Sequence, residues 1–195
     1  MSRLIPTVEV AKIIRKRLKA AFPTVKFSVR KDSNSIDVTW TDGPTNKMVE
    51  AITGDYKGGG FDGMIDMGFS IDHWLSPDGS VIVARNPGTL GQHGTIEPVN
   101  NEKPCEGAEL VHFGSKYISL NREFSLEMRN RALDSVRSKY HFETDVSDVR
   151  YICENTRWGE VIKISSDRRI PEHGKYLSEM VLADLSKRAT VAPAR

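Results

Sequence analysis

The sequence predicts an α+β fold, an antiparallel sheet flanked by helices, with an N-terminal α-β-β-α unit and a C-terminal helical segment. Two observations predict it. An apolar stripe at helical spacing over residues 7–21 is followed by two alternating, strand-like runs, and helical spacing returns over residues 125–140 and 175–188. A chain of 195 residues with 38% hydrophobic residues can bury a sizeable core.

The first helix is predicted to begin at Thr7, its expected N-cap, and to end before Pro23. Apolar residues recur along it at spacings of three and four: Ala11, Ile14, Leu18 and Ala21. This stripe is expected to face the core.

Two alternating runs, residues 26–30 and 35–40, flank a turn and predict an antiparallel hairpin. Trp40 continues the apolar alternation of the second run and is expected in the core. A shorter helix is expected to start near Pro44 and to stop at Gly54.

The middle of the chain, residues 68–109, is expected to be loop-rich apart from a short buried strand at residues 80–84. Residues 110–113 and 116–121 are then predicted to form a further strand pair.

The C-terminal part begins with a predicted helix from Ser125, its N-cap, to Tyr140. Residues 149–153 and 161–165 are predicted as two strands, although the apolar spacing around the first also fits a helix. A terminal helix is predicted over residues 175–188.

Charge is distributed in blocks. Residues 1–31 carry nine Lys and Arg against one Glu, residues 32–110 carry four against thirteen acidic residues, and residues 111–195 carry fifteen against twelve. Such blocks concern partners and self-association rather than the fold.

The basic residues of the first helix form a candidate interface. Lys12, Lys16 and Lys19 fall on the face opposite the apolar stripe, and Arg15 and Arg17 lie at its borders. This face either contacts phosphate or an acidic partner, or is an ordinary solvated surface.

A glycine-rich stretch with nearby polar residues is the second candidate, a ligand loop. Its residues are Gly58, Gly59, Gly60, Asp62, Asp66, His73 and Trp74. Glycines let a ligand or another chain approach the backbone, but the stretch matches no phosphate-binding pattern. The acidic residues and His73 could hold a divalent metal or could cap turns. Their spacing fits no ligand pattern, so neither a metal nor a cofactor is expected.

Other reactive side chains carry no motif. His93 and His112 with Cys105 could combine as base and nucleophile, but no family-specific nucleophile signature surrounds them. Trp74 and Trp158 stand in loop-like contexts, where each could stack on a base, anchor a protein partner or seal a small core.

The cysteines and the hydropathy indicate the compartment. Cys105 and Cys153 have no metal-binding spacing and are expected as free thiols in a reducing cytoplasm. No apolar run reaches the ~20 residues of a membrane span, and the N-terminus lacks a signal-peptide pattern. The sequence therefore predicts a cytoplasmic protein, in the cytoplasm of a host cell, with no membrane partner.

Several stretches together resemble a known family. They are L-K-A-A-F-P-T-V-K-F-S-V-R from Leu18, S-I-D-V-T-W-T-D-G-P-T from Ser35, M-V-E-A-I-T-G from Met48, F-D-G-M-I-D from Phe61, and the segment Leu110–Ser125. The chain is similar over residues 7–125 to the large polyvalent protein-associated domain family, number twenty-nine in its series. The division expected is a domain over residues 1–125 and an extension over residues 126–195, packed on the same core.

The resemblance implies a setting in phages and conjugative elements, without catalytic residues to carry over. With the basic first helix, it favours a non-enzymatic accessory protein that binds nucleic acid or a host nucleoprotein complex, such as a CRISPR effector of a defence system. Two alternatives stay open. One is an enzyme acting on nucleotides or nucleic acid at the glycine-rich stretch, and the other is a structural module that forms a homodimer.

Overall fold

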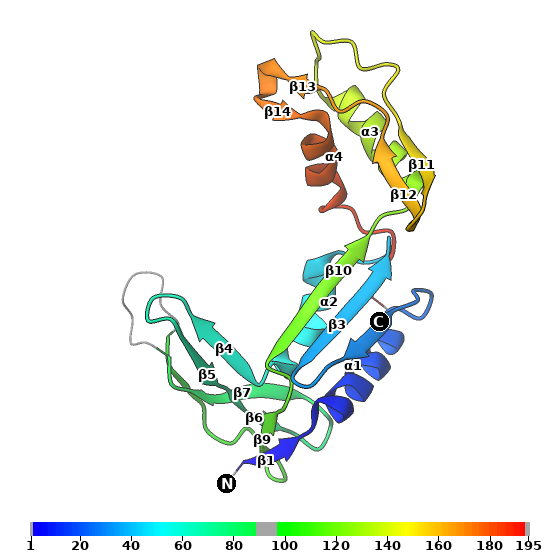
Figure 1. The fold of residues 1–195 in the computed structure, drawn as a ribbon. Coiled ribbons are helices and arrows are strands. Elements are labelled where there is room, and N and C mark those ends of the chain that lie inside the picture. Colours follow the sequence, from blue (N-terminus) through cyan, green and yellow to red (C-terminus); the bar gives the residue numbers. More distant parts are fainter. Residues whose placement is uncertain (1, 89–96, 194–195) are drawn as a thin grey trace. The chain divides into compact units, whose positions relative to one another are not determined.

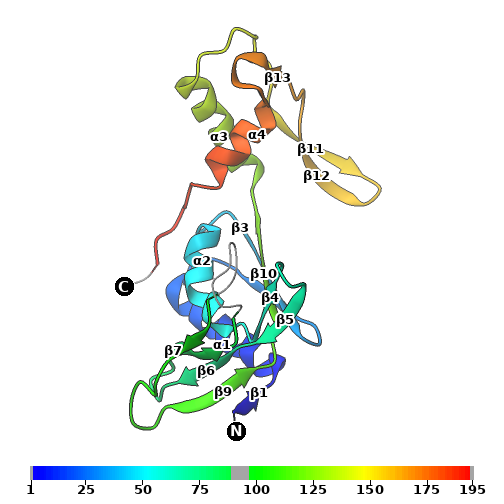
Figure 2. The same ribbon diagram turned by 90° about the vertical axis from the view of Figure 1, so that its left-hand side faces the viewer.

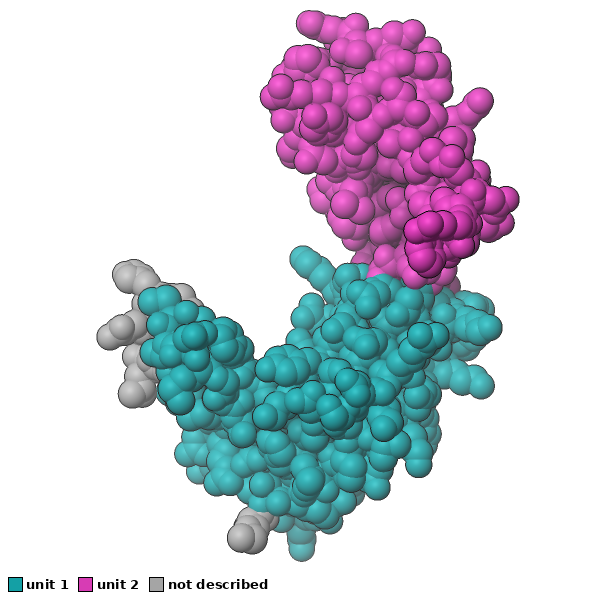
Figure 3. Space-filling view, in the orientation of Figure 1, with its two compact units in different colours: residues 1–40, 46–121, 193–195 teal, residues 41–45, 122–192 magenta. Residues whose placement is uncertain are grey.

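The computed structural model describes residues 2–88 and 97–193. The chain divides into two compact units, coloured separately in Figure 3. Unit 1 comprises residues 1–40, 46–121 and 193–195, and unit 2 comprises residues 41–45 and 122–192. Each unit has its own cluster of buried apolar side chains. The expected α+β class is confirmed.

Helix α1 spans Thr7–Ala21, as the apolar spacing predicts. The expected cap is different, because Pro6 holds the N-cap position and makes no side-chain cap bond. Thr7 is instead the first helical residue, and its hydroxyl donates to the carbonyl of Ser33 at 3.0 Å. That bond joins the start of α1 to the turn of the following hairpin.

The predicted hairpin is confirmed as β2 (Ser28–Lys31) and β3 (Ser35–Thr41), paired antiparallel with Val29 opposite Val38. Strand β10 (Tyr117–Glu123) adds to β3 and completes a three-stranded sheet in the order β10-β3-β2. Trp40 is buried, as expected. Figure 1 shows α1 beside this sheet.

Helix α2 (Asn46–Thr53) follows β3 and continues into the 3-10 turn η1 (Gly54–Tyr56). Val49 and Tyr56 bury their side chains in the core of unit 1. The helix therefore begins and ends close to the boundaries predicted from Pro44 and Gly54.

A second sheet, visible in Figure 2, occupies the region expected to be loop-rich. Its order is β1-β9-β6-β7-β8, with β1 parallel to β9 and the other pairs antiparallel. The strands are β1 (Arg3–Ile5), β6 (Asp72–Leu75), β7 (Val81–Asn86), β8 (Val99–Asn100) and β9 (Glu109–Phe113). A two-stranded hairpin, β4 (Gly59–Asp62) with β5 (Met67–Ser70), lies between β1 and β6 in the chain.

The predicted pairing of residues 110–113 with 116–121 is wrong. Both segments are strands, but β9 pairs with β1 and β6, whereas β10 pairs with β3. Gly114 and Ser115 therefore pass the chain from one sheet to the other. The Ser115 hydroxyl is buried and donates to the carbonyl of Tyr56 at 2.8 Å, which holds this crossing in place.

Unit 2 packs two helices with short strands. Its elements after β10 are α3 (Leu126–Lys139), β11 (Tyr151–Thr156), β12 (Gly159–Ile164), β13 (Arg169–Ile170), η2 (Pro171–His173), β14 (Lys175–Tyr176) and α4 (Leu177–Leu185). Ser125 caps α3 as predicted, since its hydroxyl accepts the N–H of Met128 at 3.2 Å. The predicted strands are confirmed as the antiparallel pair β11–β12. The terminal helix is shorter than predicted, because β14 occupies its expected start.

Arg122 links three segments of unit 2 that are distant in sequence. Its guanidinium donates to the carbonyls of Asp42 at 2.7 Å and Gly43 at 3.1 Å, and to that of Arg188 at 2.6 Å. Charged donors shared among backbone carbonyls make strong hydrogen bonds. Arg122 thereby fixes the segment just after α4 against the segment that follows β3.

Within the described residues, none of the helices is both long and apolar enough to cross a membrane. Cys105 and Cys153 are both exposed free thiols.

Replacing Arg122 should destabilise unit 2. In Arg122→Met the three carbonyls lose a charged donor, and we expect the free energy of unfolding to fall by about 2–4 kcal/mol. Arg131→Met is the matched control, because it removes only an exposed pair with Glu127 one helical turn away, worth roughly 0.5 kcal/mol or less. Urea denaturation followed by circular dichroism measures both. Equal losses would show that the Arg122 bonds contribute little.

Candidate nucleic-acid interface and the glycine-rich hairpin

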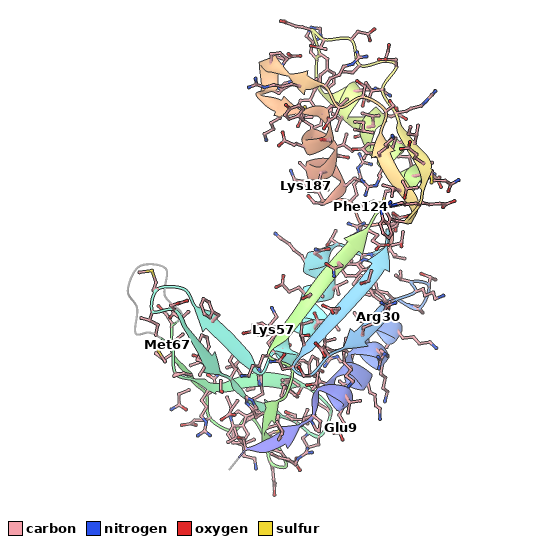
Figure 4. All side chains as sticks on the ribbon, in the orientation of Figure 1. Glu9, Arg30, Lys57, Met67, Phe124 and Lys187 are labelled. Atoms are coloured by element: carbon pink, nitrogen blue, oxygen red, sulfur yellow. The ribbon has the colours of Figure 1, made fainter. Side chains whose placement is uncertain are left out.

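The outer face of α1 presents three lysines on one side of a fixed helix. Lys12, Lys16 and Lys19 are all exposed, while the opposite side of the helix is buried. The buried residues are Thr7, Val10, Ala11, Ile14 and Leu18. Figure 4 labels Glu9, the only acidic residue of α1, near the start of the helix. We call Lys12, Lys16 and Lys19 the lysine face.

The two arginines at the borders of this face bond to neighbouring elements. Arg15 donates to the carbonyl of Val29 in β2. Arg17 donates to the Tyr56 hydroxyl at 2.8 Å and to the carbonyl of Gly79 at 3.3 Å. Both guanidinium groups therefore help to hold α1 in unit 1, and Arg15 is less free to meet a ligand than the sequence suggests.

The lysines of the face have no such partners. In the part of the chain that the structure describes, no carboxylate lies within ion-pair distance of Lys12, Lys16 or Lys19. Three ammonium groups on consecutive helical turns form a row of positive charge. Such a row can bind phosphates or an acidic surface.

The glycine-rich stretch leads into strand β4, and its first glycine, which precedes the strand, is required by packing. The N–H of Gly58 donates to the carbonyl of Ser115 at 2.8 Å, and its carbonyl accepts the N–H of Ile71 at 2.9 Å. A Cβ at Gly58 would lie 1.6 Å from the carbonyl oxygen of Phe113. Only glycine permits this approach of two backbones.

Gly60 has an equivalent role within the β4–β5 hairpin. It stands opposite Phe69, whose ring covers it so closely that a Cβ would lie 2.3 Å from the ring carbon Cζ. An aromatic side chain over a cross-strand glycine stabilises a hairpin. Gly59 has looser surroundings, with the nearest atom, the carbonyl oxygen of Phe69, at 3.3 Å.

The aspartates of the candidate loop shape the turn of the hairpin. Asp62 is buried, and its carboxylate accepts the N–H of Met64 at 2.9 Å, as in an Asx-turn. Asp66 adopts a φ of +53°, a left-handed conformation that Asp tolerates better than most residues. These contacts give both residues a role in local structure.

His73 and Trp74 lie in β6 rather than in a loop. His73 is fully buried with its ring 4.9 Å from that of Phe113, and burial lowers its pKa to about 4 despite the opposing effect of Asp72. Within the described part of the chain its Nδ1 has no hydrogen-bond partner. The indole N–H of Trp74 donates to the carbonyl of Asn101 at 3.0 Å.

The candidate loop residues are thus used in different places: the glycines in packing, the aspartates in a turn and the histidine in the core. Among residues 2–88 and 97–193, no group of three or more His, Cys, Asp or Glu side chains could hold a metal ion. The metal site considered from the sequence therefore has no cluster of ligating side chains in these residues.

A smaller polar cluster lies next to His73. The Asp72 carboxylate is 2.7 Å from Nε of Arg85 and 3.4 Å from Nδ1 of His112, at the wall of a cavity of about 500 Å³. The proposed combination with Cys105 has no support from these contacts, since Cys105 is exposed on the segment before β9. His93 lies outside the described residues.

The structure shows two exposed apolar features, of which the sequence had singled out only Trp158. Four large apolar side chains around the β4–β5 turn are exposed: Phe61, Met64, Ile65 and Met67. Trp158, at the tip of β11–β12, is 82% exposed, and the guanidinium of Arg157 lies 4.5 Å from its ring centroid. The F-D-G-M-I-D-M run and the R-W-G turn were visible signals, but neither shows from sequence which side faces solvent.

Comparison with known proteins places the fold in a family. The sequence profile of the family described as large polyvalent protein associated domain 29 matches residues 5–125, which is more than half of the chain. The matched segment includes α1, the β10-β3-β2 sheet, the β4–β5 hairpin and the second sheet apart from most of β1. No curated protein and no solved structure matches.

Gly58 offers a direct test of its packing role. Because a Cβ would overlap the Phe113 carbonyl, we expect Gly58→Ala to lower the free energy of unfolding by about 3 kcal/mol. Gly63→Ala is the control, since no atom lies within 4 Å of the added Cβ, and it should change stability by less than about 1 kcal/mol. Thermal denaturation of both variants measures the two losses of stability. Similar stabilities would contradict the close backbone approach.

His73 should make stability depend on pH. Its pKa in the native state is about 4, below the ~6.5 of an unfolded chain, so the unfolded state takes up the proton first. As pH falls from about 6.5 to 4, the wild type should therefore lose on the order of 3 kcal/mol relative to His73→Leu, which has no proton to bind. Urea titrations at several pH values measure the difference. A difference that stays constant with pH would mean that His73 is not buried as a neutral ring.

Proposed function

The chain belongs to the family of large polyvalent protein associated domain 29, and we propose that it is a non-enzymatic accessory protein of a phage or other mobile element that binds nucleic acid through the lysine face of α1. The family is associated with polyvalent proteins. Helix α1 lies within the matched residues, so the proposed interface is part of the family's domain rather than of the extension.

The observation that supports this function best is the combination of exposure and missing partners in the lysine face. Lys12 and Lys19 are seven residues apart, which corresponds to about 10 Å along a helix. One strand of a nucleic acid rises ~3.4 Å per phosphate, so about three phosphate-to-phosphate steps, and hence about four successive phosphates, span the same length. The lysine face therefore matches a run of phosphates in sign and in length.

The rigid placement of the lysine face also favours a nucleic acid as its partner. Arg15 and Arg17 tie the two sides of α1 to β2 and to η1, and the apolar stripe anchors the helix in the core. The ammonium groups start from fixed backbone positions, so little further ordering of the helix is needed on binding. Phosphate contacts of this kind carry no base information, and the expected binding is independent of sequence.

The partner is a nucleic acid, either free or exposed in a host nucleoprotein complex such as a CRISPR effector. An enzyme at the glycine-rich stretch is less well supported, because Gly58, Gly60 and Asp62 all have structural contacts there. The function proposed is therefore binding without turnover.

Charge reversal of the lysine face tests the proposal. The triple variant Lys12→Glu, Lys16→Glu, Lys19→Glu should fold normally, because exposed charges contribute little to stability. It should bind duplex DNA, single-stranded DNA and RNA much more weakly, and to the same degree whatever the sequence. For the wild type, each lysine–phosphate contact should add ~0.9 to the slope of log affinity against log salt on duplex DNA, and ~0.7 on a single strand.

The control variant carries the same change of charge in unit 2. Lys139, Lys175 and Lys187 are exposed as well, and their triple change to Glu should leave most of the affinity in place. Equal losses in both triple variants would mean that only net charge matters. If the wild type shows no salt-dependent binding to any nucleic acid, the proposed function is wrong.

A further inference from the structure

The β11–β12 hairpin of unit 2 has one edge with three unpaired backbone positions. Arg150 pairs with Ser165, whose N–H donates to the Arg150 carbonyl at 2.8 Å. Hydrogen-bonded pairs alternate with non-bonded pairs in an antiparallel ladder, so Tyr151 and Ile164 turn their backbone groups outward. By the same alternation, the outward positions of β12 are Glu160, Ile162 and Ile164.

The opposite edge is partly closed by a side chain. Asn130 of α3 accepts the N–H of Tyr151 at 2.8 Å and donates to the Tyr151 carbonyl at 3.1 Å, as a neighbouring strand would. Counting bonds from the described residues, the outward backbone groups that remain open on β11 are those of Cys153 and Asn155. On β12 no hydrogen bond from the described residues reaches the outward groups, since its ladder is with β11 alone.

Elsewhere in the chain a side chain also bonds to the backbone of an edge strand. Arg15 donates to the carbonyl of Val29 in β2, the edge strand of its sheet. Proteins protect edges in this way because unpaired backbone groups template pairing with another strand. Among the described residues no side chain bonds to the outward backbone groups of β12 in this way. Exposed apolar side chains lie beside this edge, since Trp158 is 82% and Val161 is 46% exposed.

We propose that the β12 edge pairs antiparallel with β12 of a second copy of this chain, which joins two hairpins into one four-stranded sheet. The two-fold symmetric register places Ile162 opposite Ile162 of the second copy. The inference rests on unit 2 alone and is independent of the proposed nucleic-acid binding.

The side chains of β12 are compatible with this register. Val161 stands opposite Lys163 of the second copy, and Glu160 stands opposite Ile164, so no like charges face each other. Lys163 already pairs with Glu154 of its own chain, which neutralises the strand further. Moving the centre of the symmetric register by one residue would place Lys163 opposite Lys163 in one direction. In the other direction it would leave Ile164 opposite Trp158, which lies before the start of β12.

Val161 allows a test in which dimerisation and folding respond in opposite directions. In Val161→Lys the new lysine of each copy would face Lys163 of the other copy, so two like-charge pairs would form. We expect the two copies to associate roughly fivefold more weakly. Val161→Glu would meet the same lysines with opposite charge and should strengthen the dimer by a similar factor. Within one chain Glu154 is the residue opposite Val161, so the Lys variant should fold at least as stably as the Glu variant. Sedimentation equilibrium gives the dimer affinity, and thermal denaturation of dilute protein gives the stability.

Amide exchange in the wild-type chain locates the interface without a mutation. As protein concentration rises, the N–H groups of Glu160, Ile162 and Ile164 should gain protection, while those of Cys153 and Asn155 should not. A chain that stays monomeric at all concentrations overturns the proposal, and so would a dimer that protects β11 instead. A dimer whose affinity is the same in both Val161 variants would also overturn it.

Discussion

The burial of one side of α1 determines what the other side can do. Val10, Ile14 and Leu18 are fully removed from solvent against the β10-β3-β2 sheet and its neighbours. Exposing even one of these side chains would cost about 1.5–3 kcal/mol, so the helix cannot rotate about its axis. Since residues 12, 16 and 19 lie opposite that stripe, the core itself holds the lysines in solvent. The proposed interface is a consequence of core packing and needs no dedicated positioning residues.

Close packing also explains the glycine-rich stretch. Gly58 lies where the chain passes from η1 into β4 and meets the carbonyl of Phe113, close to the crossing between the two sheets at Gly114 and Ser115. Tyr56, Phe113 and His73 pack their rings together at the same place. In a stretch that looks like a ligand loop, Gly58 therefore permits the close approach of two backbone segments, and Gly60 makes room for the ring of Phe69. The absence of a phosphate-binding pattern in the sequence is consistent with this role.

Sequence reasoning succeeded where the information is local. The amphipathic period of α1, the alternation of β2 and β3, and the Ser125 cap are all properties of short segments, and each was predicted correctly. It failed where the partner is distant: the pairing of β9 with β1 and the contact of Gly58 with Phe113 connect residues far apart in the chain. For the candidate site, the exposure of the lysine face could be predicted from helical spacing. The bonds of Arg15 and Arg17 could not, because both cross to other elements.

Protection of individual lysines from chemical acylation shows most directly whether the lysine face binds nucleic acid, because it reports on each ammonium group in the unaltered protein. The protein would be acylated with and without a duplex DNA at low salt, and the modified positions read by mass spectrometry. We expect Lys12, Lys16 and Lys19 to become protected by the DNA, and Lys139, Lys175 and Lys187 to remain reactive. Protection that is uniform over the chain, or confined to unit 2, would contradict this expectation.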